Sequence, residues 1–204
     1  GDNSTHSKDY STNSNNGTVN GSTFGSTLGI DGFGAYNFSG DAQTITIGDM
    51  STFKWLHGAE NTANFQFSII AWVKPSPIAS LVTILGTHEA TTGKIGTPLF
   101  MNQSRHLVIN IDRTGNPRVA VIGSTGSIPN DGQWHHVAVT YDQGLSQDNG
   151  VFYIDGVNVG SGNKSAGTPS TSDSSDALTI AHDQAGEYFN GTMDDVRIYN
   201  RTLS

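Results

Sequence analysis

The feature that most constrains this chain is the alternation of apolar and polar residues within many short segments. In the run FQFSIIAWVKP every second residue is apolar, namely Phe65, Phe67, Ile69, Ala71 and Val73. Successive side chains of a strand point to opposite faces, so these side chains share one face. The run predicts a central strand, and Ile70 and Trp72 predict partial cover of its other face.

Similar segments follow along the chain, with turn residues between nearly all of them. The further predicted strands are AYNF, QTITIG, LVTILG, PLFMN, RHLVINID, PRVAVIG, QWHHVAVTYD, VFYIDGVNVG, DALTIAHD and MDDVRIYN. Asp155-Gly156 is the dipeptide of a two-residue type I′ hairpin, whose central residues both need positive φ. The stretch DMSTFKWLHGAENTA can hold one or two helical turns. This cadence predicts an all-β fold, a two-sheet antiparallel β-sandwich.

Residues 1–34 form a polar opening rich in Asn, Ser and Gly. They show no period of 2 or 3.6, so we expect a surface loop there. With 34% hydrophobic and 14% charged residues, the composition suits short strands joined by polar turns. A chain of 204 residues is long enough for one sandwich with its own core. We therefore expect a single domain over 1–204.

Charge and cysteine content exclude several classes of partner. The net charge is −8, and the ten Lys and Arg residues are spread singly along the chain. No basic stripe can neutralise phosphates or anionic lipid, so nucleic acid and membrane surfaces are not expected partners. No apolar run approaches the ~20 residues of a membrane span. The absence of Cys excludes disulfides and thiolate metal sites.

Four ordered motifs carry a resemblance to a known family. They are FSIIAWVKPS (Phe67–Ser76), DGQWHHVAVTYD (Asp131–Asp142), FYIDGVNVG (Phe152–Gly160) and FNGTMDDVRIYNRTLS (Phe189–Ser204). Together with the Asn-rich run Lys8–Gly21, they resemble the laminin G-like, concanavalin A-like lectin/glucanase domain. The resemblance implies a jelly roll, often one module of a long secreted or surface-anchored protein. Members usually begin with a further short strand and end a few residues later, so both termini are interpreted as clipped.

Glycoside hydrolysis is the least favoured activity. It needs two carboxylates across the scissile bond, which the glucanase relatives carry on one strand as E-x-D-x-E. The only Glu residues, Glu60, Glu89 and Glu187, are isolated, and no predicted strand carries two acids at an i, i+2 spacing. His135 and His136 are adjacent on a strand and face opposite ways, so they cannot hold one metal together. The sequence therefore predicts that the chain is not an enzyme.

The closing strand MDDVRIYN raises the question of calcium. Period two places Asp194 with Val196 and Ile198, and Asp195 on the other face, so one acid is expected to point inward. An inward carboxylate needs a cation or several N–H donors. The resemblance implies a structural calcium ion with Asp194 as first ligand; the equal alternative is that Asp194 accepts backbone N–H bonds from the Asn-rich loop. The candidate companion ligands are Asp9, Asp31, Asp41 and Gln43.

Aromatic residues in loop-like stretches are candidates for stacking on sugar rings. They are Trp55, Tyr36 and Tyr188, with Phe33 nearby in the opening segment. For Trp55, burial as an anchor of its loop is the competing interpretation. Trp72 and Trp134 lie in strand motifs and are expected in the core.

Eight N-x-Ser/Thr sequons occur, and chance would give about four in a chain so rich in Asn, Ser and Thr. The acceptor residues are Asn3, Asn16, Asn20, Asn37, Asn102, Asn163, Asn190 and Asn200. The excess suggests a glycosylated, exported chain.

Three functions follow from the sequence. The first is a non-catalytic extracellular or cell-surface module for binding or adhesion that recognises carbohydrate or glycoprotein. The second is a structural domain or subunit of a surface filament, pilus or surface layer, held by strand pairing with neighbouring subunits at an edge that a missing first strand leaves open. The third is the hydrolase.

Overall fold

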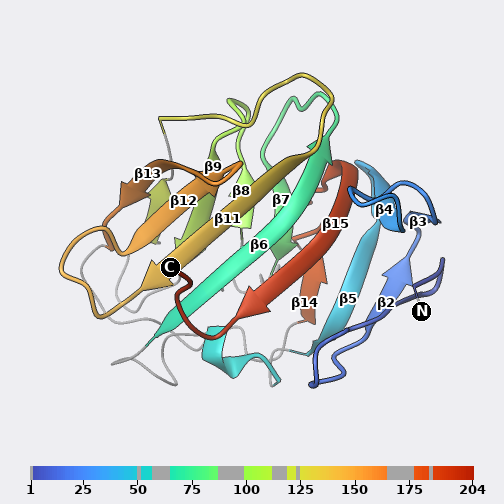
Figure 1. Cartoon of the computed structure of the whole chain (residues 1–204), viewed down its shortest axis with the longest axis horizontal. Helices are drawn as coiled ribbons and strands as arrows, with labels where there is room; N and C mark the ends of the chain where they lie inside the picture. Colours follow the sequence, from blue (N-terminus) through green and yellow to red (C-terminus); the bar gives the residue numbers. More distant parts are fainter. Residues whose placement is uncertain are drawn as a thin grey trace.

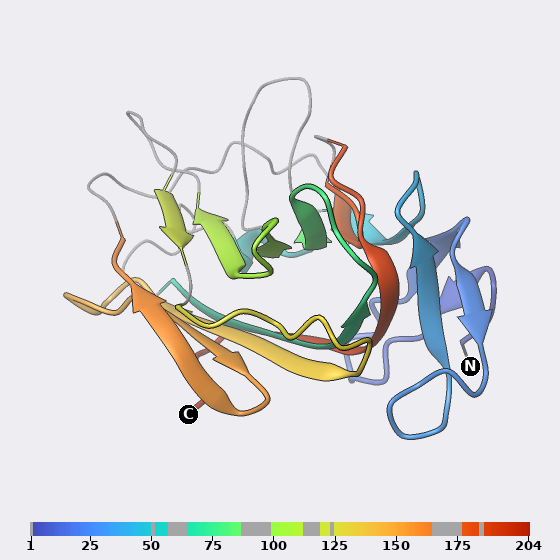
Figure 2. The ribbon, with the colours of Figure 1, turned by 90° about the horizontal axis from the view of Figure 1, so that it is seen from above.

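The computed structural model describes residues 2–49, 52–56, 65–86, 99–111, 119–122, 125–164, 177–183 and 186–204. Within these residues the chain forms two antiparallel sheets that pack face to face, as Figures 1 and 2 show from two directions. This arrangement confirms the predicted β-sandwich of the jelly-roll type.

One sheet has eight strands in the order β1-β2-β5-β14-β7-β8-β9-β10 within the described part of the chain. Their bounds are β1 His6–Ser7, β2 Gly17–Asn20, β5 Thr44–Asp49, β14 Ala177–Ile180, β7 Val82–Gly86, β8 Leu99–Met101, β9 Leu107–Ile111 and β10 Val119–Ile122.

The other sheet has seven described strands in the order β13-β12-β11-β6-β15-β4-β3. Their bounds are β13 Val157–Gly162, β12 Gly150–Ile154, β11 His135–Asp142, β6 Gln66–Pro75, β15 Asn190–Tyr199, β4 Ala35–Ser39 and β3 Thr23–Gly25. A short 3-10 helix, η1 (Lys54–Leu56), precedes β6 and lies in the stretch that the sequence predicted to hold one or two helical turns.

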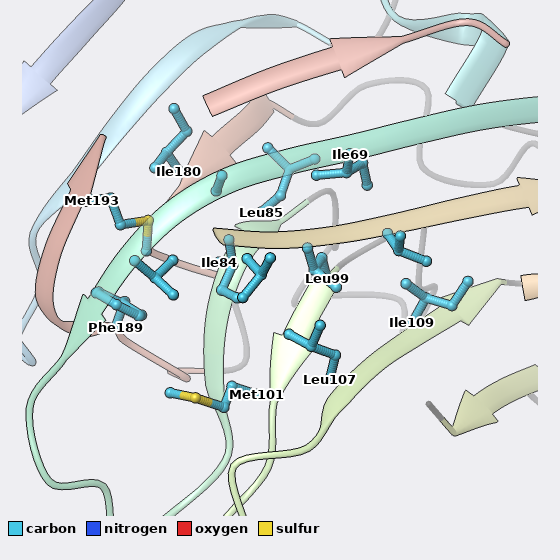
Figure 3. Close-up of a cluster of buried hydrophobic side chains, with 14 of the residues drawn as sticks. Ile69, Ile84, Leu85, Leu99, Met101, Leu107, Ile109, Ile180, Phe189 and Met193 are labelled. Atoms are coloured by element: carbon cyan, nitrogen blue, oxygen red, sulfur yellow. The ribbon is translucent and has the colours of Figure 1, made fainter. Parts of the chain in front are cut away.

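Apolar side chains from both sheets fill the space between them, and Figure 3 shows part of this core. The predicted inner face of β6 is confirmed, because Phe67, Ile69, Ala71 and Val73 are fully buried. Phe67 stacks on Tyr141 of β11, with ring centroids 5.3 Å apart. The core therefore lies along the strand that the alternation identified.

The tryptophans of the strand motifs differ from their expected places. Trp72 and Trp134 are only partly buried. Trp72 lies on the open face of the seven-stranded sheet, opposite His136 of β11, whose ring meets it edge-on at 5.2 Å. Period two explains this, because Ala71 and Val73 on either side of Trp72 occupy the core face.

The opening residues 1–34 are more ordered than a loop. β1, β2 and β3 lie within them, and β2 pairs with β5 so that Val19 lies opposite Ile45. The sequence signal is weak because only Gly17 and Val19 of β2 are buried. β1 pairs with the outer side of β2, and the backbone N–H of Val19 donates to the carbonyl of Thr5. Residues 5–7 thus pair with the outer side of β2, and β1 is the edge strand of the eight-stranded sheet.

Two details of the chain path complete the fold. Asp155 and Gly156 both have positive φ, 51° and 77°, which confirms the type I′ hairpin between β12 and β13. The C-terminal segment crosses the outer face of the seven-stranded sheet (Figure 1). There Ser68 Oγ donates to the carbonyl of Arg201 and accepts from the N–H of Leu203. In the described residues, no helix is long and apolar enough to cross a membrane.

Candidate functional site

A pocket of about 390 Å³ opens at the edge of the sandwich where the N-terminal segment, β3 and β15 meet. This is the edge near the N-terminus in Figure 1. The described residues that line the pocket are Asp2, Tyr10, Phe24, Asp31, Phe33, Gly34 and Asp194. Tyr10 and Phe33 are 72% and 70% exposed, so two large rings lie open to solvent beside three carboxylates.

A tight turn in the β3–β4 connection places the Phe33 ring in this pocket. The N–H of Gly29 donates to the carbonyl of Phe33 at 2.6 Å, and the N–H of Phe33 donates to Asp31 Oδ1 at 2.9 Å. Gly34 is needed because a Cβ there would lie 2.1 Å from Cζ of Phe24. Backbone and glycine sterics together therefore turn the Asp31 carboxylate and the Phe33 ring towards the same space.

Asp194 lies on β15 between buried Met193 and a β-bulge that begins directly after it. Asp194 lies opposite Trp72 of β6, but the register shifts before Arg197, which lies opposite Ile70. Asp195 has a φ of 48° inside this bulge. The extra residue breaks the period of two after Asp194, so Asp194 does not share a face with Ile198, which lies opposite the buried Ile69. Asp194 shares the side of Trp72, and Asp195 is exposed on the strand surface.

Both oxygens of Asp194 accept a backbone hydrogen bond. The N–H of Ile30 donates to Oδ2 at 3.0 Å, and the N–H of Asp195 donates to Oδ1 at 2.7 Å. Burial raises the pKa of Asp194; the two N–H bonds lower it, and the nearby charges of Asp31 and Asp195 raise it, with a net rise. The alternative interpretation from the sequence, backbone N–H donors from the Asn-rich loop, holds in kind only, because the donors are Ile30, which follows the run Lys8–Gly21, and Asp195 of β15 itself.

The N-terminal segment supplies the remaining wall, which the sequence did not single out. The hydroxyl of Tyr10 donates to Asp2 Oδ2 at 2.8 Å, and the N–H of Lys8 donates to Asp2 Oδ1 at 2.7 Å. The hydrogen bond to Asp2 raises the pKa of Tyr10. An aromatic residue within an otherwise polar stretch was the only sequence signal for this wall.

The five candidate metal ligands are not brought together. Asp31 and Asp194 share the pocket, but Asp9 accepts hydrogen bonds from Ser11 and Asn15 within its own loop. Asp41 and Gln43 cap backbone N–H groups of the β4–β5 turn. Among the described residues, no group of three or more His, Cys, Asp or Glu side chains is placed to hold a metal. This arrangement does not fit the six to eight oxygen ligands of calcium, and calcium stays a prediction.

None of the three candidate stacking residues is among the described residues that line the pocket. Tyr36 is 8% exposed, and its hydroxyl donates to the carbonyl of His6, so its ring is not open to a sugar. Burial raises the pKa of Tyr36 to about 12. Trp55 packs partly buried against the core, as the anchor interpretation expected. Tyr188 stacks on His182, with centroids 4.5 Å apart.

The sequon asparagines all lie outside the core. Six are exposed and two, Asn102 and Asn190, are partly buried. Space for a glycan therefore exists at the surface, and glycosylation stays a prediction. For the hydrolase, Glu60 and Glu89 lie outside the described residues.

At the opposite end of the sheet, His135 is held between two carboxylates. Its Nδ1 lies 2.8 Å from Asp155 Oδ2, and its Nε2 lies 3.0 Å from Asp131 Oδ1. Burial lowers the pKa of His135, but these hydrogen bonds outweigh it and the pKa is raised. The ring pairs with acids from a loop and from the β12–β13 hairpin, so it serves the fold and holds no metal with its neighbour His136.

The sandwich and its edge pocket define a β-module of the lectin type. A family model described as the concanavalin A-like lectin/glucanases superfamily matches residues 39–204. The chain therefore belongs to the concanavalin A-like lectin/glucanase superfamily. No curated protein matches the sequence.

Solved structures share the fold at low sequence identity. Trypanosoma rangeli sialidase has a TM-score of 0.63 at 16% identity; the alignment covers 100% of this chain but only 30% of that enzyme. The CBM40 module of Ruminococcus gnavus IT-sialidase, bound to α2,3 sialyllactose, has a TM-score of 0.62 at 16% identity over 83% of this chain and 91% of that one. Domain 4 of an extracellular GH43 arabinanase from Geobacillus stearothermophilus, solved in complex with arabinotriose, has a TM-score of 0.55 at 19% identity. The alignment covers 92% of this chain and 84% of that domain.

Proposed function

We propose that this chain is a non-catalytic carbohydrate-binding module of a secreted or cell-surface protein, and that it binds its sugar in the edge pocket. The observation that carries the proposal is the pair of exposed rings, Tyr10 and Phe33, beside the carboxylates of Asp2, Asp31 and Asp194. Aromatic faces stack on the C–H surface of a sugar ring, and carboxylates accept hydrogen bonds from its hydroxyls.

Two similar structures support this class of ligand. The CBM40 module was solved with sialyllactose and the arabinanase domain with arabinotriose, each on a comparable sandwich. The non-catalytic part of the proposal rests on Asp194, whose two oxygens already hold backbone N–H groups and are poorly placed to deliver a proton. Export rests on the sequons and on the extracellular arabinanase.

The experiment is a broad glycan array, followed by isothermal titration of each hit with the wild type and with Phe33→Ala. Val157→Ala is the matched control, because Val157 is 63% exposed on the distant β12–β13 hairpin. We expect Phe33→Ala to weaken binding about tenfold or more, since stacking contributes roughly 1–2 kcal/mol. The control should bind as the wild type does. An array without hits, or turnover of a bound glycan, would contradict the proposal.

The assembly function is the second candidate from the sequence, and the short strand β1 is the edge of the eight-stranded sheet at which a neighbouring strand would pair. It stays a prediction, and a self-associated species by analytical ultracentrifugation would support it.

A further inference from the structure

The polar atoms of the edge pocket are hydrogen-bond acceptors. Its described lining holds three carboxylates, and none of these lining residues is Lys, Arg or His. The single hydroxyl of the lining, that of Tyr10, already donates its proton to Asp2 Oδ2. A ligand must therefore supply the donors itself.

These acceptors have spare capacity. Asp31 Oδ1 accepts the N–H of Phe33, while Oδ2 accepts no hydrogen bond from the described residues. Each oxygen of Asp194 accepts one N–H, and a carboxylate oxygen can accept two. Several lone pairs thus stay open to a donor on the ligand.

No cationic side chain is among the described residues that line the pocket. The Asp31 carboxylate is close enough to Asp194 to raise its pKa by repulsion. The ammonium of Lys8 lies 4.9 Å from the centre of the Tyr10 ring, and Lys8 is not part of the described lining. A cationic group in the pocket would relieve this repulsion, whereas an anionic sugar would add to it.

We propose that the pocket selects a sugar with an unsubstituted, protonated amine, such as the glucosamine units of deacetylated chitin, and rejects acidic sugars. The ring of such a sugar would stack on Phe33 or Tyr10 while its ammonium contacts Asp31 and Asp194. The proposal rests on the proposed function, because it assigns the ligand class of the same pocket. It also separates this chain from the CBM40 module, whose bound sialyllactose is acidic.

The test is isothermal titration at about pH 6, where amino sugars are cationic and most carboxylates ionised. The probes are trimers of glucosamine, N-acetylglucosamine and galacturonic acid, measured in low salt with EDTA. The variants are Asp31→Asn, which removes a charge and keeps the shape, and Phe33→Ala. Asp148→Asn is the control for non-specific attraction to the acidic chain, because Asp148 lies exposed in the β11–β12 loop.

We expect the glucosamine trimer to bind about tenfold more tightly than its N-acetylated form, the low end of what a hydrogen bond between charged groups contributes. Asp31→Asn should remove most of this preference, Asp148→Asn should keep it, and Phe33→Ala should weaken both trimers.

Other outcomes overturn the inference in distinct ways. Equal binding of the two trimers, with no effect of Asp31→Asn, would refute the amine preference and leave the carbohydrate-binding function standing. Tightest binding of the galacturonic acid trimer would do the same. Loss of glucosamine binding in millimolar calcium, with calcium itself bound through Asp31, would replace the amine site with a metal site. No binding on the glycan array, together with no binding of any of the three trimers, would refute both proposals.

Discussion

The paired carboxylates around His135 predict a stability that depends on pH. A neutral imidazole has one N–H, so only the protonated ring can donate to Asp155 and Asp131 at once. The pKa of His135 is raised above its ordinary 6.5. The stability from this ring is therefore fully present below pH 6.5 and is lost as the pH rises through the raised value.

The perturbation is Asp155→Asn. Asn is tolerated at the positive φ of 51° in the hairpin, and its Oδ1 can still accept the N–H of His136 as Asp155 Oδ1 does. A hydrogen bond between charged groups contributes about 1.5–3 kcal/mol. The Asp155 side chain is 47% exposed, which favours the lower end of that range. We expect Asp155→Asn to lower the free energy of unfolding by about 1.5 kcal/mol near pH 5 and by about 0.5 kcal/mol near pH 9.

The assay is urea denaturation of both proteins across that pH range. Asp148→Asn is the matched control, because Asp148 also has positive φ, 52°, and its carboxylate pairs with Ser161 rather than with a histidine. The change in free energy of unfolding that Asp148→Asn causes should be the same at both pH values. An Asp155→Asn cost that is constant with pH, or that grows towards pH 9, would refute the charged-ring interpretation.

Three further predictions concern the core, a glycine and calcium. Phe67→Ala should lower the free energy of unfolding, measured by urea denaturation, by about 3–5 kcal/mol, because the ring is fully buried. Gly191→Ala should cost at least about 3 kcal/mol, since its Cβ would lie 2.4 Å from the Lys74 carbonyl at a φ of 134°; Gly132→Ala, with a φ of 71° and no atom within 4 Å, should cost only about 1–2 kcal/mol. Equal costs would contradict this reasoning. Millimolar calcium should leave the melting temperature unchanged, because both oxygens of Asp194 accept N–H groups; a rise of several degrees would support the calcium prediction.

The strands with clear alternation were predictable from the sequence, and the shortest ones were not. β6 alternates over ten residues, so its inner face could be assigned residue by residue. β2 has four residues with two buried positions, and it becomes a strand because β5 pairs with it from 24 or more positions along the chain. Such long-range pairing leaves no local period to detect.

The candidate site was predictable only in part. Asp31, Phe33 and Asp194 stood out as acids and an aromatic in loops or at a closing strand. The bulge at Asp195 depends on the backbone and has no periodic signal, so the sequence could not show that Asp194 and Ile198 lie on opposite faces of β15. Tyr10 reaches the pocket through tertiary folding of the N-terminal segment, which no spacing rule encodes.

The most direct test of the central claim is an NMR titration of the labelled protein with the tightest glycan from the array. The account predicts shift changes that centre on Tyr10, Phe24, Phe33 and Asp194, the residues that line the pocket. Shift changes centred on the open sheet face around Trp72, with none in the pocket, would contradict it.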